Sequence, residues 1–123
     1  MPVSYSIRGD VVHLQMEGEY QPGEIKTHVA HALADPELSD CPQFLFDVSH
    51  STSLGTRSPV DLQDMAGFLA NSIRPFGSRL GMVAHGELHF GLLRMAEVYS
   101  EQSGLEARVF RSIDEATGWL EKA

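Results

Sequence analysis

The sequence predicts an α/β fold with a mixed, largely parallel sheet of about five strands, four helices and an N-terminal β-hairpin. Alternating apolar residues near the N-terminus indicate two paired strands. Short apolar runs farther along indicate buried strands, and residues with helical spacing follow each run. Strands that alternate with helices are typically parallel and joined by right-handed crossovers. With 123 residues, the chain has the length of one domain, and we expect a single domain over residues 1–123.

Two paired strands and a helix are predicted first. Apolar and polar residues alternate over residues 3–7 and again over residues 12–17, the period of a strand with one buried face. Gly9-Asp10 lies between the two runs and is a turn signal, so the strands are expected to form an antiparallel hairpin. Pro22-Gly23 then breaks the chain, and residues 25–33 carry an apolar stripe with helical spacing.

Short apolar runs predict the remaining strands. Residues 44–48 and 80–84 are typical of central strands buried on both faces, and residues 107–110 of a last strand. The hydroxyl-rich residues after the first run are expected to form a loop. A helix is predicted after that loop, because Ser58 suits an N-cap and Pro59 suits the first helical position.

Two further helices are predicted from apolar stripes. One runs from Leu88 to Tyr99, and Gly104 suits the position just after its end. The other follows a predicted cap at Asp114 and closes the chain. Its inward-facing residues are predicted to be Ala116, Trp119 and Leu120.

Charge and composition exclude several classes of protein. The chain has 17 acidic and 9 basic residues and a net charge of −8, so we expect no nucleic-acid partner. Its first ten residues lack the basic start and apolar core of a signal peptide. No apolar run reaches the roughly 20 residues of a membrane span. We therefore expect a cytoplasmic protein with no transmembrane segment. Cys41 is the only cysteine, and an ordinary thiol is expected.

The order of elements and three stretches of sequence resemble the SpoIIAA-like, or STAS, domains of anti-sigma-factor antagonists. The stretches are Phe44–Asp47, Leu92–Glu97 and Arg108–Leu120, and the last resembles the tail of a bacterial STAS/SEC14-like subgroup. The resemblance implies a STAS fold and a regulatory module acting through protein contact at the loop between the third strand and the second helix. The SEC14-like comparison implies an alternative: a carrier or sensor of a small apolar or lipid-like ligand, with peripheral contact to a membrane surface.

The phosphorylation motif of this family is absent from the chain. Regulatory members carry Asp-Ser-Ser-Gly after the third strand, and a partner kinase phosphorylates the first serine. The corresponding stretch here is Gly55-Thr56-Arg57-Ser58, which does not match. Thr56 and Ser58 are hydroxyls in the same neighbourhood, so they are the candidate phosphoacceptors.

Residues 49–58 form the first candidate site. They follow a predicted strand and precede a helix N-terminus, and ligands favour the carboxyl ends of strands in open α/β sheets. Free N–H groups at a helix start also attract anions. The alternative is that the hydroxyls only satisfy a surface turn and a helix cap. The candidate residues for binding a ligand or partner are His50, Ser51, Thr52, Ser53, Thr56, Arg57 and Ser58.

Residues 85–91 form the second candidate site, which we expect on the same edge of the sheet. They follow the fourth predicted strand and open a helix, and His85 and Phe90 are the candidate contacts. His85 and His89 are four residues apart, but the helix is expected to begin only after Gly86. The two rings are therefore not expected to share a helix face as zinc ligands, and no metal site is predicted.

The helix predicted from Leu88 to Tyr99 has a broad apolar arc. Such an arc is typical of a helix packed on two sides, of a homodimer contact or of a flap over an apolar pocket. The residues predicted to line or gate such a pocket are Leu88, Phe90, Leu92, Leu93 and Met95.

Sequence motifs for catalysis are missing. The chain has no Gly-x-Ser-x-Gly elbow, no P-loop and no Gly-x-Gly-x-x-Gly. We therefore expect no catalytic residues and no cofactor. The expected function is to bind a protein partner or a small apolar ligand rather than to catalyse a reaction.

Overall fold

The computed structural model describes residues 2–52 and 54–122, and within them it confirms an α/β fold with a five-stranded sheet and four α-helices. The strands are β1 (Val3–Arg8), β2 (Val11–Gly18), β3 (Gln43–Ser51), β4 (Leu80–Val83) and β5 (Ala107–Phe110). The α-helices are α1 (Pro22–Leu33), α2 (Pro59–Ile73), α3 (Glu87–Gln102) and α4 (Ile113–Glu121). Two short 3₁₀ helices are η1 (Leu54–Thr56) and η2 (Arg74–Phe76).

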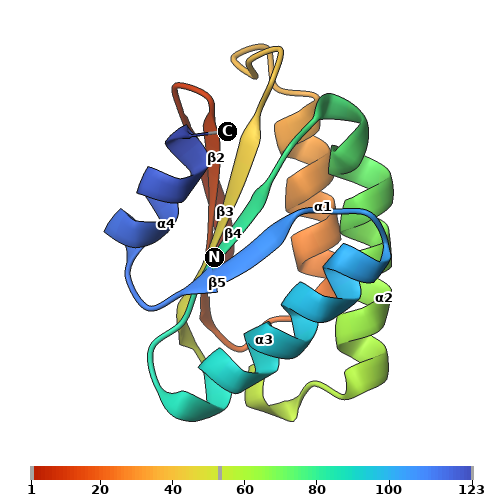
Figure 1. The fold of residues 1–123 in the computed structure, drawn as a ribbon, viewed down its shortest axis with the longest axis vertical. Helices are drawn as coiled ribbons and strands as arrows, with labels where there is room; N and C mark the ends of the chain where they lie inside the picture. Colours follow the sequence, from red (N-terminus) through yellow and green to blue (C-terminus); the bar gives the residue numbers. More distant parts are fainter. Residues whose placement is uncertain (1, 53, 123) are drawn as a thin grey trace.

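The sheet has the strand order β1-β2-β3-β4-β5. β1 and β2 pair antiparallel, as the predicted hairpin requires, with Gly9 in the left-handed region at φ 59° in the turn between them. The three other pairings are parallel, so β3, β4 and β5 all end at the same edge of the sheet. Figure 1 shows α1, α2 and α3 on one face of the sheet and α4 on the other.

The predicted start of α2 is confirmed. The Ser58 hydroxyl accepts from the Asp61 N–H at 3.1 Å, and the Asp61 carboxylate accepts from the Ser58 N–H at 3.1 Å. Pro59 occupies the first turn, where its missing N–H costs nothing. This reciprocal pair is a capping box, and it fixes where the helix begins.

The predicted start of α4 is wrong by two residues. Ser112, not Asp114, is the N-cap: its hydroxyl accepts from the Glu115 N–H at 3.2 Å. Asp114 instead lies in the first turn, where the positive end of the helix dipole still stabilises its carboxylate. Both residue types suit a cap, and backbone geometry decides between them.

The loop predicted over residues 49–58 is also shorter than expected. β3 continues to Ser51, because Glu17 and Gly18 of β2 still pair with His50 and Ser51 after a register shift. The apolar run ends at Val48, but strand pairing depends on backbone hydrogen bonds rather than on apolar side chains. The polar end of β3 was therefore mistaken for loop.

The core is divided between the two faces of the sheet. The larger cluster lies under α1, α2 and α3 and includes Leu14, Phe44 and Ile73, which are all fully buried. The smaller cluster lies under α4 and consists of Leu45, Val83, Ala116 and Leu120, with Val11, Phe110 and Trp119 packed against it. Ala116 and Leu120 thus point inward as predicted, and Trp119 is half-buried at the side.

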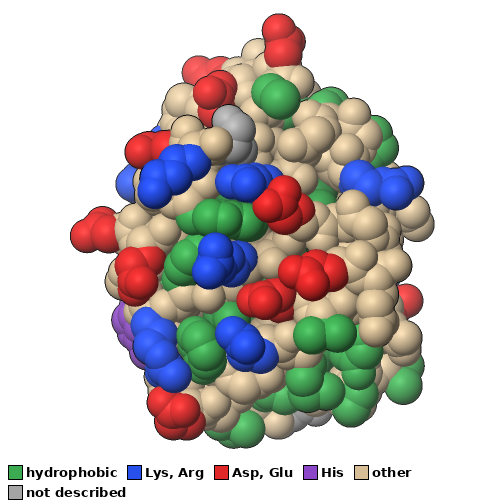
Figure 2. Space-filling model, viewed as in Figure 1, with side chains coloured by type: hydrophobic (Ala, Val, Ile, Leu, Met, Phe, Trp, Pro, Cys, Tyr) green, Lys and Arg blue, Asp and Glu red, His purple; other side chains and the backbone are tan. Residues whose placement is uncertain are grey.

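The edge strand β5 is covered rather than open. The Glu97 carboxylate of α3 accepts from the Val109 N–H at 3.0 Å, so this outward-facing amide is already satisfied. Arg108 lies over the Phe110 ring at 5.8 Å from its centroid. Figure 2 shows acidic, basic and apolar side chains interspersed on this face. A covered edge with mixed charge discourages another strand from pairing with it.

Candidate functional site

Two segments that follow neighbouring strands lie against each other at the carboxyl ends of β3 and β4. A Cβ atom built on Gly55 would lie 3.3 Å from Leu88 Cδ2 and 3.9 Å from His89 Nε2. The expectation that residues 49–58 and 85–91 share one edge is therefore correct. We call this surface the loop edge; its described members are His50, Thr52, Gly55, Arg57, Ser58, His85, Leu88 and His89.

Exposure at the loop edge differs from residue to residue. His50, Thr52, Ser58 and His85 are exposed, as a contact surface requires. Leu88 is 65% exposed, the second most exposed large apolar side chain among the described residues. The loop edge therefore combines polar groups with one largely exposed apolar side chain.

Ser51 is buried and does not belong to this surface. Its side chain is 4% exposed, and its hydroxyl donates to the Tyr20 hydroxyl at 3.0 Å. The same oxygen accepts from the Leu54 N–H at 3.2 Å. Ser51 therefore anchors the start of η1 to Tyr20 instead of meeting a ligand or partner.

The start of α2 is occupied by its own side chains. The Asp61 N–H and the Ser58 N–H are both bonded within the capping box, and the Asp61 carboxylate adds negative charge there. This arrangement is unfavourable for a second anion at the helix start. Of the candidate phosphoacceptors, Ser58 is an exposed cap, and phosphorylation at Ser58 or Thr56 stays a prediction. The Thr56 side chain and all of Ser53 lie outside what the structure describes.

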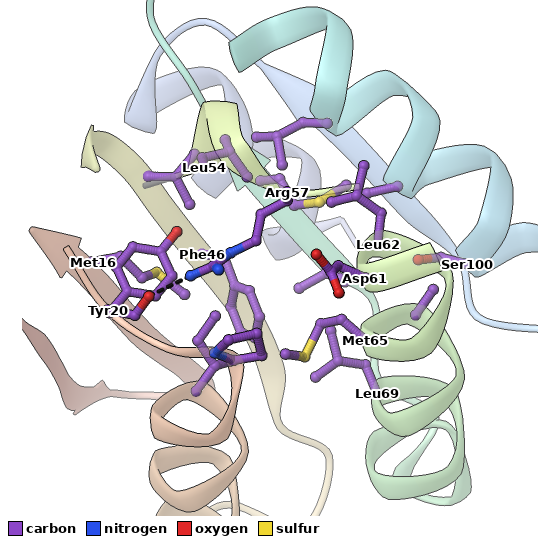
Figure 3. A pocket seen from close by; sticks show the side chains of 18 residues that line it. Met16, Tyr20, Phe46, Leu54, Arg57, Asp61, Leu62, Met65, Leu69 and Ser100 are labelled. Carbon is purple, nitrogen blue, oxygen red and sulfur yellow. Dashed lines mark hydrogen bonds between the residues drawn. The ribbon is translucent and has the colours of Figure 1, made fainter. Parts of the chain in front are cut away.

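An apolar cavity of about 80 Å³ lies behind the loop edge, between the sheet and the helices α1, α2 and α3. Figure 3 shows it from close by. Its wall is formed by residues from β2, β3, β4, η1 and all three helices. The lining residues are Met16, Tyr20, Pro22, Ile25, Phe46, Val48, Leu54, Arg57, Asp61, Leu62, Met65, Ala66, Leu69, Leu80, Met82, Leu93, Ala96 and Ser100.

Two charged residues lie among these apolar walls. The Arg57 side chain reaches toward Tyr20, with the Asp61 carboxylate on the α2 side, as Figure 3 shows. A guanidinium N–H of Arg57 donates to the Tyr20 carbonyl oxygen, and Arg57 Cζ lies 5.4 Å from the centroid of the Tyr20 ring. Arg57 is half-buried. A cation thus lies beside a largely apolar space and contacts both the backbone and the ring of Tyr20.

Only one of the predicted pocket residues lines this cavity. Leu93 is 5% exposed and belongs to the wall, whereas Leu88, Phe90, Leu92 and Met95 do not line it. Phe90 packs under Arg111, whose Cζ lies 4.0 Å from the ring centroid, while Leu92 and Met95 pack against the larger core cluster. The cavity-facing side of α3 is instead marked by Leu93, Ala96 and Ser100, at spacings of three and four residues.

Tyr20 and the α2 residues were not predicted as site residues. The apolar stripe of α2 was recognised, but such a stripe is equally consistent with ordinary core packing. Two of the lining residues on facing helices, Ala66 and Ala96, are small. Small side chains on both helices are the signal of unfilled space that the sequence offers.

A second buried polar group lies on the opposite face of the sheet. His13 of β2 is 8% exposed, and its Nε2 has no hydrogen-bond partner among the described residues. Burial lowers the pKa of His13, while the nearby Asp47 carboxylate acts to raise that pKa and Arg8 to lower it. Asp47 is engaged with Ser49, whose hydroxyl donates to its Oδ1 at 2.6 Å.

Metal-ligating residues do not gather anywhere in the described part of the chain. No group of three or more His, Cys, Asp or Glu side chains is placed to hold an ion there. Cys41 is exposed, and its Sγ lies 3.6 Å from the Phe76 carbonyl oxygen. Among the same residues, no helix has the length and apolar character needed to cross a membrane.

Comparison with known proteins places the fold but not the function. No protein-family model and no curated protein matches the sequence. The structure is similar to that of the protein TM1081, solved by NMR, with a TM-score of 0.64 and 16% identity over 97% of this chain and 88% of that one. It is also similar to an uncharacterised DUF3478-family protein from Shewanella loihica PV-4 that has a SpoIIAA-like fold. That match has a TM-score of 0.60 and 18% identity over 96% of this chain and 91% of the other. The predicted SpoIIAA-like fold is thereby confirmed.

Proposed function

We propose that this chain, whose fold is SpoIIAA-like, is a non-enzymatic binding module that contacts a protein partner through the loop edge. The observation that carries the proposal is the packing of Gly55 against Leu88 and His89, which joins two loops into one surface. Protein interfaces commonly have an apolar centre and a polar rim. Leu88 supplies an exposed apolar side chain here, and His50, Thr52 and His85 supply polar groups beside it.

The sequence resemblance supports the same surface. In SpoIIAA-like regulators, the loop between the third strand and the second helix is where the partner-controlling phosphorylation occurs. The equivalent loop here is η1 with Arg57 and Ser58, which lies beside Leu88. The hydroxyl motif is absent here while the edge is exposed, so protein contact without that motif is the simplest function for this surface.

The test compares two exposed apolar residues on the same helix. Leu88→Asp places a charge on the loop edge, and Val98→Asp places one on α3 away from it, at a residue that is 51% exposed. Tagged wild-type and variant chains are purified from the organism's own cells, and the proteins that accompany them are quantified. We expect a partner that Leu88→Asp reduces by about tenfold or more, as truncation of a central interface residue does, and that Val98→Asp leaves in place.

The same variants identify or reject the surface. A wild-type chain that sediments as a dimer, with Leu88→Asp sedimenting as a monomer, would identify the partner as a second copy. Partners lost from Val98→Asp but retained by Leu88→Asp would place the contact elsewhere on α3 and contradict the proposal.

A second function is favoured by the cavity. An apolar space of about 80 Å³ beside a half-buried arginine supports the binding or sensing of a small, largely apolar ligand. Native mass spectrometry of protein purified from its own cells tests it. An adduct that is present under native conditions and lost on denaturation supports a bound ligand, and the bare chain mass under both conditions counts against one.

A further inference from the structure

We propose that β1 pairs with β1 of a second copy of this chain, antiparallel and centred on Tyr5, so that two five-stranded sheets join into one. This interface goes beyond the proposed functions, because it lies at the β1 edge of the sheet and uses neither the loop edge nor the cavity. A strand that pairs with its own copy in this way forms a closed dimer with twofold symmetry.

One side of β1 has backbone groups available for another strand. β1 is the first strand in the sheet, and β2 is its one strand partner among the described residues. The Glu17 N–H of β2 donates to the Pro2 carbonyl oxygen at 2.7 Å, so even-numbered residues here direct their backbone groups toward β2. Successive residues of a strand alternate in this direction. The N–H and C=O groups of Val3, Tyr5 and Ile7 therefore point away from β2.

The two edges of the sheet differ in how they are covered. At β5, the Glu97 carboxylate accepts from the Val109 N–H. The outward N–H groups of Val3, Tyr5 and Ile7 have no acceptor within residues 2–52 and 54–122. Pairing of β1 with a second copy, centred on Tyr5, would satisfy these groups with about six backbone hydrogen bonds. An edge strand of six residues with free donors and acceptors is a template for such pairing.

Charge complementarity identifies the partner as a second copy. Pairing centred on Tyr5 places Arg8 opposite Pro2 of the second copy, and that Pro2 is itself paired with Glu17 in its own sheet. Arg8 and the second copy's Glu17 then lie in one row across the joined sheet, with Cα atoms about 10 Å apart, a gap that two long side chains can bridge. By symmetry, the same pair forms at the other end of β1.

Both charged side chains are available for this contact. Arg8 and Glu17 are exposed on the same face of the sheet, because they alternate with the buried or half-buried residues of β1 and β2. Neither has an ion-pair partner in the part of the chain that the structure describes. β1 itself carries no acidic residue, so the pairing strands do not add to the repulsion between two chains of charge −8.

Other registers lose this match. A shift by two residues places Arg8 either opposite Ser4, in the row of Gln15, or beyond the end of the second copy's β1. A shift by one residue would bring the exposed side chains of one copy onto the face that the other copy buries. The register centred on Tyr5 also pairs Val3 with Ile7 on the apolar side of the strand, where Ile7 is half-buried and gains further cover.

The experiment measures self-association and the exchange of edge amides on the full chain. Because the net contribution of a backbone hydrogen bond is small, we expect a dissociation constant on the order of 10–100 µM by sedimentation. In NMR hydrogen exchange, the amide protons of Tyr5 and Ile7 should exchange slowly in the dimer and at least tenfold faster, on the order of the free-strand rate, after dilution. Those of Ser4 and Ser6 are bonded to β2 and should change little.

Charge reversal tests the register. Arg8→Glu and Glu17→Arg should each weaken the dimer about tenfold, since two attractive pairs become repulsive. The double variant restores opposite charges and should return the dissociation constant to within about threefold of wild type. Arg108→Glu and Glu101→Arg make the same changes in net charge at exposed residues of β5 and α3, and they should leave the dimer intact. A dispersed NMR spectrum for each variant establishes that it is folded.

The other outcomes overturn the inference and are distinguishable from failure of the proposed functions. A chain that stays monomeric at millimolar concentration would contradict pairing through β1 and leave the loop edge and the cavity untouched. A dimer that Leu88→Asp abolishes and Arg8→Glu leaves intact would be a contact of the loop edge instead. Amides of Tyr5 and Ile7 that become protected only when a different protein is added would assign the β1 edge to that protein and reject the second copy.

Discussion

The two faces of the sheet are packed in different ways. Under α4, a Cβ atom built on Gly81 of β4 would lie 3.4 Å from Leu120 Cδ1 and 3.5 Å from Leu45 Cδ1, so the Leu120 side chain packs closely over the backbone of the strand. Under α1, α2 and α3, the apolar layer is larger but encloses a cavity of about 80 Å³. Both faces are apolar, and this cavity lies on the three-helix face.

This difference shows that apolar character and close packing are separate properties. Helix α4 packs over Gly81, which has no side chain to hold the helix away from the sheet. Its buried residues there are Ala116 and Leu120. Three helices must also pack against one another, and where α2 and α3 meet, the wall is formed partly by Ala66 and Ala96. Small side chains on both helices leave volume between them and the sheet, since backbone positions are set by the larger residues around them.

The largest effect is expected from removing a side chain on the closely packed face. Leu120 is 1% exposed, so Leu120→Ala should lower the free energy of unfolding by about 2–5 kcal/mol. Met65 is half-buried on the cavity wall, and Met65→Ala should cost less than about 2 kcal/mol. Urea unfolding of both variants measures the comparison. Equal losses would mean that the three-helix face is packed as tightly as the α4 face.

A smaller effect, with opposite signs, is expected from adding side-chain volume on α2. Ala66 lines the cavity, whereas Ala70 on the same helix is equally buried at 3% exposure and does not line it. Ala66→Val should be neutral or raise the free energy of unfolding by about 1 kcal/mol, because the new carbons enter empty space. Ala70→Val should lower it by about 1–3 kcal/mol by overpacking.

The pair of α2 variants is internally matched. Both place valine in a helix interior, so the loss in helix propensity is the same in each and cancels in the comparison. Thermal or urea unfolding provides the measurement. A loss of stability in Ala66→Val as large as that in Ala70→Val would show that the cavity closes in solution and is not available to a ligand.

The smallest effect concerns acid stability and His13 on the α4 side of the sheet. Burial lowers the pKa of His13 below its ordinary value of 6.5, so the unfolded chain takes up this proton before the folded chain does. The corresponding stability is fully present above pH 6.5 and is lost as the pH falls toward the lower pKa of the folded state. His13→Gln should therefore reduce the loss of stability on acidification.

An exposed histidine provides the control for this pH dependence. His50→Gln changes the same residue type at an exposed position, and its urea midpoints are measured alongside those of wild type and His13→Gln. Carboxylates contribute equally to all three proteins, so the difference between the slopes isolates His13. Identical slopes below pH 6.5 for wild type and His13→Gln would contradict the burial argument.

Local patterns predicted most of the fold correctly. The capping box at Ser58 and Asp61, the glycine after α3 and the hairpin turn at Gly9 are each specified by residues within a few positions of one another. The errors occurred where pairing over distance decides. β3 continues past its apolar run because β2 supplies backbone partners, and Ser112 rather than Asp114 receives the cap hydrogen bond.

The candidate site was predicted only in part. The sequence placed residues 49–58 and 85–91 on one edge, since both follow parallel strands, and the contact of Gly55 with Leu88 and His89 agrees. It did not predict that Ser51 is buried beneath Tyr20, 31 residues away, because side chains that distant meet only after the sheet has formed. Of the five residues predicted to form a pocket, only Leu93 lines the cavity, and α3 presents Ala96 and Ser100 beside it.

The sequence by itself determined the order of strands and helices, the largely parallel sheet and the edge at which its loops meet. These features follow from periodicity, capping and turn residues, which act over a few positions of the chain. Only the tertiary structure decided that space remains between α2, α3 and the sheet, and that Arg57 lies beside it against Tyr20. Whether an apolar layer is filled depends on the volumes of side chains from several elements at once, and no local pattern in a sequence records that sum.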